Sequence, residues 1–131
     1  MTKRNDPQRP DPRRRLGARG EAAAADHLEA DGYRILARNV RADGVEIDLV
    51  ATRGRVLAFV EVKTRTSVRA GSPEEAVDER KQARLVRGAI SWLRTHGARG
   101  RTVRFDVVSA WPDGTGFRVV HRTGAFDAGG G

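Results

Sequence analysis

Three carboxylates and one lysine recur at alternate positions of two neighbouring apolar runs. The run "VEIDLVA" holds Glu46 and Asp48, and the run "RVLAFVEVKTR" holds Glu61 and Lys63. Carboxylates held close together repel one another and raise each other's pKa unless a cation lies among them. A hard ion such as Mg²⁺ (or Mn²⁺) uses one or two carboxylates and takes its remaining ligands from water and substrate phosphate. An adjacent lysine can then orient or help to deprotonate a water molecule.

The two runs are expected to form a β-hairpin. A tight turn at Arg53-Gly54 places Asp48 across from Phe59 and Glu46 across from Glu61. All four charged groups then project from one face, because side chains alternate along a strand. The opposite face is apolar throughout and comprises Val45, Ile47, Leu49, Val56, Ala58, Val60 and Val62. A solvated, charge-paired face is the alternative explanation, and it is common on antiparallel sheets.

Two expected helices carry further polar side chains on their apolar faces. In the helix at 16–33, Glu21 shares one face with small and apolar neighbours, and Gly32 occupies the position of a left-handed cap. In the helix at 72–97, Gln82 extends a stripe made of Leu85, Val86, Ala89, Ile90 and Leu93. The alternatives are a first-turn glutamate stabilised by the helix dipole and a glutamine at the edge of its stripe. Convergence of these groups with the hairpin carboxylates favours a functional site.

The order of elements predicts an α/β protein. Strands are expected at 33–41, 45–51, 55–65, 102–111 and 117–122, between and after the two helices. Ser72 and Glu75 form a capping box at the start of the second helix, with Pro73 at its first position. A mixed five-stranded sheet flanked by two main helices follows from this order.

Length and composition indicate one globular domain. The chain has 131 residues, of which 38% are hydrophobic and 32% charged. We expect a disordered basic arm at 1–15, a domain at 16–122 and a flexible tail at 123–131. With no cysteine, a thiolate zinc site and a thiol nucleophile are excluded. No apolar run approaches the ~20 residues that span a membrane, and no secretory signal is recognisable, so a cytoplasmic protein is expected.

The charge balance gives nucleic acid a modest advantage as a partner. The net charge is +8, but residues 1–19 alone carry +5, which leaves +3 for the rest of the chain. Lys81, Arg84 and Arg87 are expected on the exposed side of the second helix. They can contact phosphate there, or they can simply form a solvated helix face.

Other polar and aromatic residues are expected to be structural. His27, His96 and His121 are widely spaced and lack ligand-like partners. Asp106, in "RFDVV", is interpreted as a strand-end charge. The two tryptophans, Trp92 and Trp111, are expected to pack in the core, because no aromatic cluster accompanies them.

An aspartate on one strand followed by Glu-x-Lys on the next resembles the PD-(D/E)XK nuclease signature, which stands here as Asp48 and Glu61-Val62-Lys63. From about Leu16 to Val120 the chain more specifically resembles the YraN-like family of small uncharacterised bacterial proteins (UPF0102). The matching stretches occur in order and are "GARGEAAAADHLEADGYRILARN", "EIDLVA", "FVEVKTR", "GSPEEAV", "ARLVRGAISWL" and "RFDVV".

This resemblance implies a restriction-endonuclease-like fold and kinship with Holliday-junction resolvases. It further implies that Asp48 and Glu61 are metal ligands, with the Val62 carbonyl as a further ligand. Lys63 is implied as the catalytic lysine and Glu21 as the helix carboxylate of the site. Gln82 is implied as a further site residue, on a weaker match. The family usually reads Gly-Glu-Ile-Asp, whereas this chain has an extra residue, Val45, before the Glu. The insertion puts in doubt the path of the preceding loop and any role for Glu46, but not Asp48 or Glu61.

Three functional hypotheses follow. The first is a Mg²⁺-dependent endonuclease that hydrolyses DNA, with branched or damaged DNA as candidate substrates. The second is a non-catalytic DNA-binding or adaptor protein on a nuclease scaffold, and the third is a small interaction protein with a solvated hairpin face. Intact Asp48, Glu61 and Lys63 favour the enzyme. A homodimer is compatible with the first hypothesis, because one such site cuts one strand.

Overall fold

The computed structural model describes residues 11–66 and 78–128. Its elements are α1 (Pro12–Ala30), β1 (Arg34–Ala42), β2 (Val45–Arg53), β3 (Val56–Thr64), α2 (Glu79–His96), β4 (Thr102–Asp113) and β5 (Gly116–Phe126). The strands form one sheet in the order β1-β2-β3-β4-β5. Strands β3 and β4 run parallel and the other neighbours run antiparallel. The predicted α/β fold, a mixed five-stranded sheet with two helices, is confirmed.

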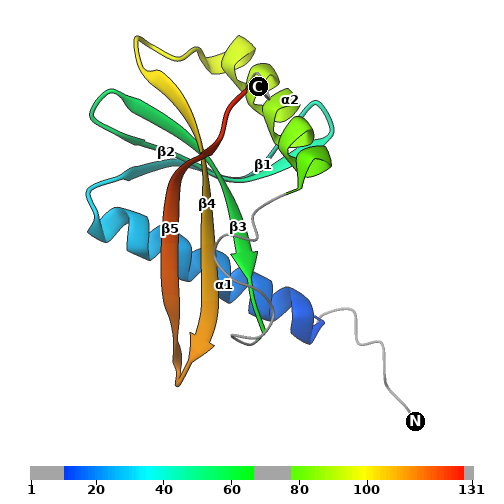
Figure 1. Ribbon diagram of the computed structural model, residues 1–131, viewed down its shortest axis with the longest axis vertical. Helices are drawn as coiled ribbons and strands as arrows, with labels where there is room; N and C mark the ends of the chain where they lie inside the picture. The colour runs from blue at the N-terminus through cyan, green and yellow to red at the C-terminus, as the bar shows by residue number, and fades with distance from the viewer. Residues whose placement is uncertain (1–10, 67–77, 129–131) are drawn as a thin grey trace.

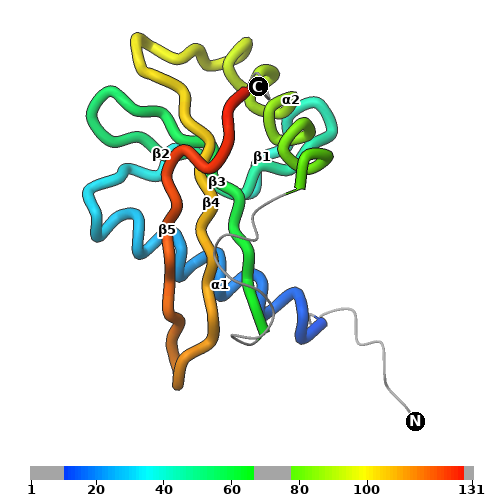
Figure 2. Tube along the Cα trace, viewed as in Figure 1, coloured from blue at the N-terminus to red at the C-terminus, as the bar shows by residue number. Residues whose placement is uncertain are grey.

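Each helix covers a different face of the sheet and has its own apolar cluster. Leu28 of α1 packs with Leu49 and Val60 in one cluster, and Trp92 of α2 packs with Phe59 in the other. Helix α1 contacts mainly β3 and β4, whereas α2 contacts mainly β1 and β2 (Figure 1). The turn of the β4–β5 hairpin lies at the opposite end of the molecule from α2 (Figure 2). Nowhere in the described residues is a helix both long and apolar enough to cross a membrane.

Two predicted domain boundaries differ from the structure. Helix α1 begins at Pro12, capped by the Asp11 carboxylate, which accepts a hydrogen bond from the Arg13 amide at 2.8 Å. Residues 12–15 are therefore helical and not part of a disordered arm, while residues 1–10 lie outside the described residues. Strand β5 continues to Phe126, so the predicted tail at 123–131 begins too early.

The predicted start of α2 is wrong, and so is one residue, Ile90, of its predicted inner face; Leu85 and Ala89 of that face are buried as predicted. Asp78 has extended backbone (φ −71°, ψ 170°) and caps the helix at the Lys81 amide, so a helix running unbroken from 72 is wrong at this residue. The predicted capping box at 72–75 lies outside the described residues. Ile90 is 46% exposed, whereas Trp92 is buried with its ring edge-on to Phe59 at 5.6 Å. The large indole, which gains more from burial than Ile90, takes the inner side.

The pairing register of the β2–β3 hairpin differs by two residues from the predicted one. Arg53 pairs with Val56, so the two-residue turn is Gly54-Arg55, with Gly54 at a positive φ of 58° that favours glycine. The pairing of Leu49 with Val60 then places Asp48 level with Glu61 and not with Phe59.

A fully buried carboxylate ties β4 to β5. Asp106 accepts two hydrogen bonds from the Arg104 guanidinium, at 2.8 and 2.7 Å, one from His121 Nε2 at 2.8 Å and one from the Gly124 amide at 3.0 Å. Burial alone would raise the pKa of Asp106, but the hydrogen bonds from His121, Arg104 and Gly124 outweigh it and lower that pKa. Asp106 is thus structural, as expected, although it lies in the middle of the fold and not at a strand end.

We predict that Asp106→Ala lowers the free energy of unfolding by about 3–5 kcal/mol, because it removes the carboxylate that pairs with the partly buried Arg104 guanidinium and the nearly buried His121 imidazole. Urea unfolding at pH 7 measures the change. Asp113→Ala, in the exposed β4–β5 turn, is the matched control and should change stability by less than about 0.5 kcal/mol. Equal effects of the two substitutions would show that the buried network adds nothing to stability.

Candidate active site at the fork between two strands

The strands β2 and β3 separate at the point where the sequence places its carboxylates. They pair from Arg53 and Val56 as far as Leu49 and Val60. Beyond this point β2 remains paired with β1 as far as Val45, and β3 remains paired with β4 as far as Thr64. The sheet therefore opens into a fork, with α1 beneath one arm and α2 beneath the other.

Asp48 lies at the base of the fork and bridges its two arms. Its Oδ2 accepts a hydrogen bond from the Val62 amide at 2.8 Å, although the backbones of β2 and β3 no longer pair there. The side chain is half-buried. Burial raises the pKa of Asp48, and the negative charge of Glu46 raises it further, against the opposing effects of the Val62 hydrogen bond and of Lys63 and Lys81.

Strand β2 changes the face that it presents at Asp48. Ile47 packs in the α2 cluster, whereas Leu49, only two residues later, packs in the α1 cluster. The predicted single apolar face through Val45, Ile47 and Leu49 is therefore wrong. A regular strand would keep Ile47 and Leu49 on one side, so the backbone must be irregular where Asp48 meets the fork. Asn39, in the neighbouring part of β1, has a positive φ of 49°.

Glu61 is the group whose ionisation the site changes most. Burial, with the charge of Asp48 as the second cause, raises its pKa from 4.5 to about 7, against the partly compensating charges of Lys63 and Lys81. Glu21 contributes a smaller repulsion from α1. In the part of the chain that the structure describes, no hydrogen bond or ion pair reaches the Glu61 carboxylate.

Two lysines, Lys63 from β3 and Lys81 from α2, meet beside these carboxylates. Burial lowers the pKa of Lys63, and the adjacent Lys81 ammonium lowers it further, while Glu61 acts in the opposite direction. The sequence placed Lys81 on the exposed side of α2 and did not assign it to the site. Lys81 lies in the first turn of α2, after the Asp78 cap, and lines the cleft together with Glu61.

Glu21 reaches the site from α1, as predicted. The side chain is half-buried, and burial followed by the charge of Asp48 raises its pKa, while a hydrogen bond with the Asn39 side chain lowers it. The preceding residue, Gly20, allows this approach, because a Cβ atom there would overlap the Thr64 side chain of β3. Asn39 is a site neighbour that sequence reasoning missed; a polar residue inside the strand "YRILARNVR" was its only signal.

The fork opens into a cleft of about 320 Å³ between the start of β2 and α2. Its charged lining is made of Glu46 and Glu61 facing Lys81 and Arg84. Val45, the inserted residue, is buried at the cleft wall, so the insertion leaves Asp48 and Glu61 in place. Glu46 is exposed, yet its charge acts on both Asp48 and Glu21.

The donors at the fork fit Mg²⁺ or Mn²⁺ as a two-carboxylate site. Asp48 and Glu61 repel each other, and a divalent cation would remove the cause of that repulsion. Among the described residues no three His, Asp or Glu side chains are grouped closely enough to form a complete protein cage. Such a site matches the preference of Mg²⁺ for few carboxylates and several waters. The Val62 carbonyl as a ligand and a role for the half-buried Gln82 stay predictions.

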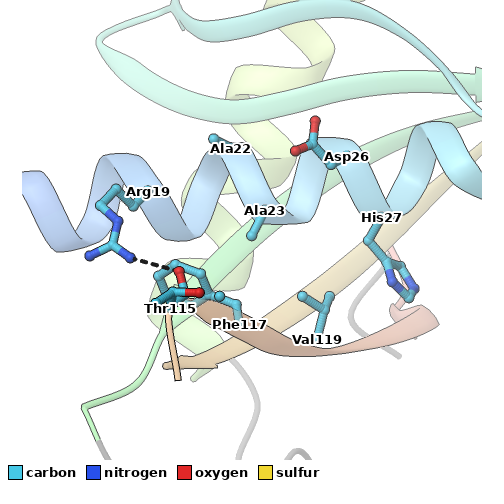
Figure 3. Close-up of a pocket in the computed structure, with 9 residues that line it drawn as sticks. Arg19, Ala22, Ala23, Asp26, His27, Thr115, Phe117 and Val119 are labelled. Atoms are coloured by element: carbon cyan, nitrogen blue, oxygen red, sulfur yellow. Dashed lines mark hydrogen bonds between the residues drawn. The ribbon is translucent and has the colours of Figure 1, made fainter. Parts of the chain in front are cut away.

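A second groove, of about 640 Å³, lies between α1 and the β4–β5 hairpin, away from these groups. Figure 3 shows Arg19 reaching from α1 to the Thr115 carbonyl, beside Phe117, with Val119 farther along the groove towards His27. Asp26 and His27 are the only acid and imidazole in its lining. This groove lacks the convergence of ionisable groups that marks the fork.

Comparisons with known proteins establish the family. Residues 20–110 match the model of the uncharacterised protein family UPF0102, and the chain belongs to this family. A UPF0102 protein of Moorella thermoacetica is 52% identical over 101 residues, covering 77% of this chain and 84% of that protein. A UPF0102 protein of Parafrankia sp. is 50% identical over 113 residues, covering 86% of this chain and 96% of that protein. The resemblance to the YraN-like family is therefore confirmed.

Among solved structures, the chain is similar to SfsA of Pyrococcus furiosus in complex with Ca²⁺. The match has a TM-score of 0.36 and 17% identity, and it covers 84% of this chain and 62% of that one. A similarity at this level carries no argument about the site, which rests on the geometry of this chain alone.

We predict that Glu61→Gln stabilises the metal-free protein above neutral pH. Folding raises the pKa of Glu61, so the folded state favours the protonated carboxyl and loses stability as the pH rises from 4.5 through about 7. In EDTA, the free energy of unfolding of the variant should exceed that of the wild type by about 2–3 kcal/mol at pH 8 and by under about 1 kcal/mol at pH 5. Urea unfolding at the two pH values measures both differences.

Glu29→Gln is the control for this comparison, because Glu29 is exposed and, among the described residues, its ion pairing is limited to a 4.0 Å contact with Arg38. Its effect should stay below about 0.5 kcal/mol at either pH. A destabilised Glu61→Gln protein at pH 8 would contradict the electrostatic description of the fork.

Proposed function

We propose that this member of the UPF0102 family is a metal-dependent endonuclease that hydrolyses DNA phosphodiester bonds, with branched or damaged DNA as its candidate substrates. The observation that carries the proposal is the mutual perturbation of Asp48, Glu61 and Lys63 at the fork. Glu61 lines the cleft, and it interacts electrostatically with Asp48 and Lys63. Strongly perturbed ionisable groups beside a cleft are typical of active sites, because catalysis needs pKa values matched to proton transfer near neutral pH.

Asp48 and Glu61 are the residues that would hold the cation. The chemistry that Mg²⁺ or Mn²⁺ supplies at such a site is Lewis-acid polarisation of a phosphate oxygen and acidification of water. The Val62 amide fixes the orientation of the Asp48 carboxylate through its 2.8 Å hydrogen bond. A fixed carboxylate loses little conformational freedom when a ligand arrives, so the site is organised in advance.

Lys63 is suited to receive a proton from the attacking water. Burial and the neighbouring Lys81 lower its pKa, which increases the fraction of neutral amine at neutral pH. The water oxygen forms a bond to phosphorus as its proton passes to the Lys63 Nζ, the bond from phosphorus to the leaving sugar oxygen breaks, and that oxygen takes a proton from solvent water. Glu21, held by Asn39, keeps a further carboxyl group at the edge of the same site.

Lys81 and Arg84 are suited to contact the DNA backbone. Both line the cleft from α2, opposite Glu46 and Glu61, and both are exposed. Cationic side chains beside a carboxylate cluster draw a phosphate towards groups that would otherwise repel it. A single fork offers one set of these groups, so cleavage of both strands of a duplex would need two copies of the chain or two successive events.

We predict metal-dependent cleavage that is lost when either Glu61 or Lys63 is removed. Labelled linear duplex, single strand, flap and four-way junction are incubated with Mg²⁺, with Mn²⁺ or with EDTA. Glu61→Ala and Lys63→Ala should each slow cleavage of the preferred DNA at least ~100-fold, the usual effect of losing a general base or a principal electrostatic group. Binding of the same DNA is measured in parallel by fluorescence anisotropy.

Glu29→Ala and Arg94→Ala, both on exposed helix surfaces away from the fork, are the controls and should cleave as the wild type does. If wild type and variants bind DNA equally well and none cuts any substrate, the protein is a DNA-binding adaptor on a nuclease scaffold. Cleavage that survives in Lys63→Ala and in EDTA would remove the proposed chemistry altogether.

A further inference from the structure

Another cavity, distinct from the fork cleft and from the groove beside α1, lies at the far end of α2 from the fork. It occupies about 370 Å³ between β1, the last turn of α2 and the loop that leads into β4. Lys81 of the fork and His96 of this cavity are fifteen residues apart on one helix, which corresponds to about 22 Å. The cavity is therefore separate from the carboxylate site, and its volume falls in the usual range of about 300–1,000 Å³ for small-molecule pockets.

A bulge in the edge strand β1 directs an apolar side chain to this cavity. The register of β1 against β2 shifts between Ile35 and Ala37, which makes Leu36 the extra residue. Ile35 packs towards the α1 cluster and Ala37 towards the α2 cluster, as the shift requires. Leu36 lines the cavity and is 39% exposed, one of two large apolar side chains so exposed in the described residues.

A pair of stacked rings forms another wall. The His96 ring lies 4.1 Å from that of Trp92, with an angle of 19° between their planes. The Trp92 carbonyl accepts a hydrogen bond from His96 Nδ1 at 3.1 Å, which fixes the orientation of the imidazole. Trp92 is 7% exposed, whereas His96 is exposed, so the imidazole is the ring that an added planar group can meet.

Three arginines complete the cavity, and no carboxylate lines it. Arg34 comes from β1, while Arg99 and Arg101 come from the loop before β4. No ion pair within 4.0 Å is found for any of the three among the described residues. Arg99 has a positive φ of 55°, a conformation that is unusual for this residue type and frequent where a loop presents a side chain for function.

The electrostatic balance of the cavity favours an anion. The end of α2 contributes a partial negative charge of about half an elementary unit, which opposes anion binding. Three guanidinium groups outweigh it severalfold, and each offers paired donors that match the oxygens of a phosphate. The apolar wall and the stacked rings add affinity for a flat group attached to that anion.

We propose that this cavity binds a single nucleotide, with its base against the His96 ring and Leu36 and its phosphate among Arg34, Arg99 and Arg101. The same chemistry is present in a free mononucleotide and in an unpaired nucleotide of a DNA strand. An acidic peptide satisfies the guanidinium groups but provides no planar group for the stacked rings, so the nucleotide fits the whole cavity better. The inference does not rest on the proposed nuclease activity.

Calorimetry with the full chain in EDTA tests the proposal, using deoxyadenosine monophosphate, deoxyadenosine, inorganic phosphate, a deoxyadenylate tetramer and polyglutamate as probes. The mononucleotide should bind at least tenfold more tightly than either of its two parts. Arg34→Gln combined with Arg101→Gln should weaken that binding by about tenfold or more, because charge-assisted hydrogen bonds are lost. Arg55→Gln combined with Arg94→Gln is the charge-matched control and should bind like the wild type.

Amide chemical shifts of the wild type locate the contact independently of any variant. The mononucleotide should move the signals of Leu36, His96 and Arg99 and leave those of Asp48 and Glu61 unchanged. A tetramer that binds more tightly than the mononucleotide identifies a DNA strand as the source, and equal affinities identify a free nucleotide. The proposal fails if 10 mM mononucleotide produces no binding, if phosphate alone binds as tightly, or if only polyglutamate binds.

Discussion

The hydrogen bond from the Val62 amide to the Asp48 carboxylate holds together two strands that have stopped pairing with each other. Below this bond β2 and β3 form an ordinary antiparallel ladder, and above it each strand follows a different neighbour and a different helix. The separation creates the space in which charged groups from both arms and both helices meet. The Asp48 carboxylate thus replaces a backbone hydrogen bond between the two arms, and it is at the same time one of the charged groups of the site.

The fork concentrates charges that the rest of the molecule keeps apart. Burial raises the pKa values of Asp48 and Glu61, the charge of Glu46 raises that of Asp48 further, and the charge of Asp48 raises that of Glu61 further. The ligand-free site therefore opposes folding when both are ionised. By contrast, Asp106 is a fully buried carboxylate whose partners surround it, and its pKa is lowered. The charge of Asp106 is therefore compensated by its neighbours, whereas the charges of Asp48 and Glu61 are not fully compensated. Uncompensated charge of this kind is characteristic of sites that bind a cation or a substrate.

The sequence allowed the order of elements and the convergence of three carboxylates to be predicted, because alternation along strands and spacing along helices are local properties. Asp48, Glu61 and Glu21 come together as their patterns indicated. The fork itself was not predictable, since it depends on which neighbour each strand follows after Leu49, a choice that tertiary packing makes. For the same reason Lys81 was assigned to solvent: its helix face is polar, but the end of α2 faces the opening between the strands.

The ionisation of Glu61 itself, followed through its side-chain carboxyl carbon by nuclear magnetic resonance, tests the electrostatics of the fork most directly. In the wild type without divalent ions, we expect a titration midpoint near pH 7. Saturating Mg²⁺ should move the midpoint back towards or below the ordinary value of 4.5, because the cation favours the ionised carboxylate. A midpoint near 4.5 that Mg²⁺ leaves unchanged would contradict the central claim, since the fork would then be a solvated surface.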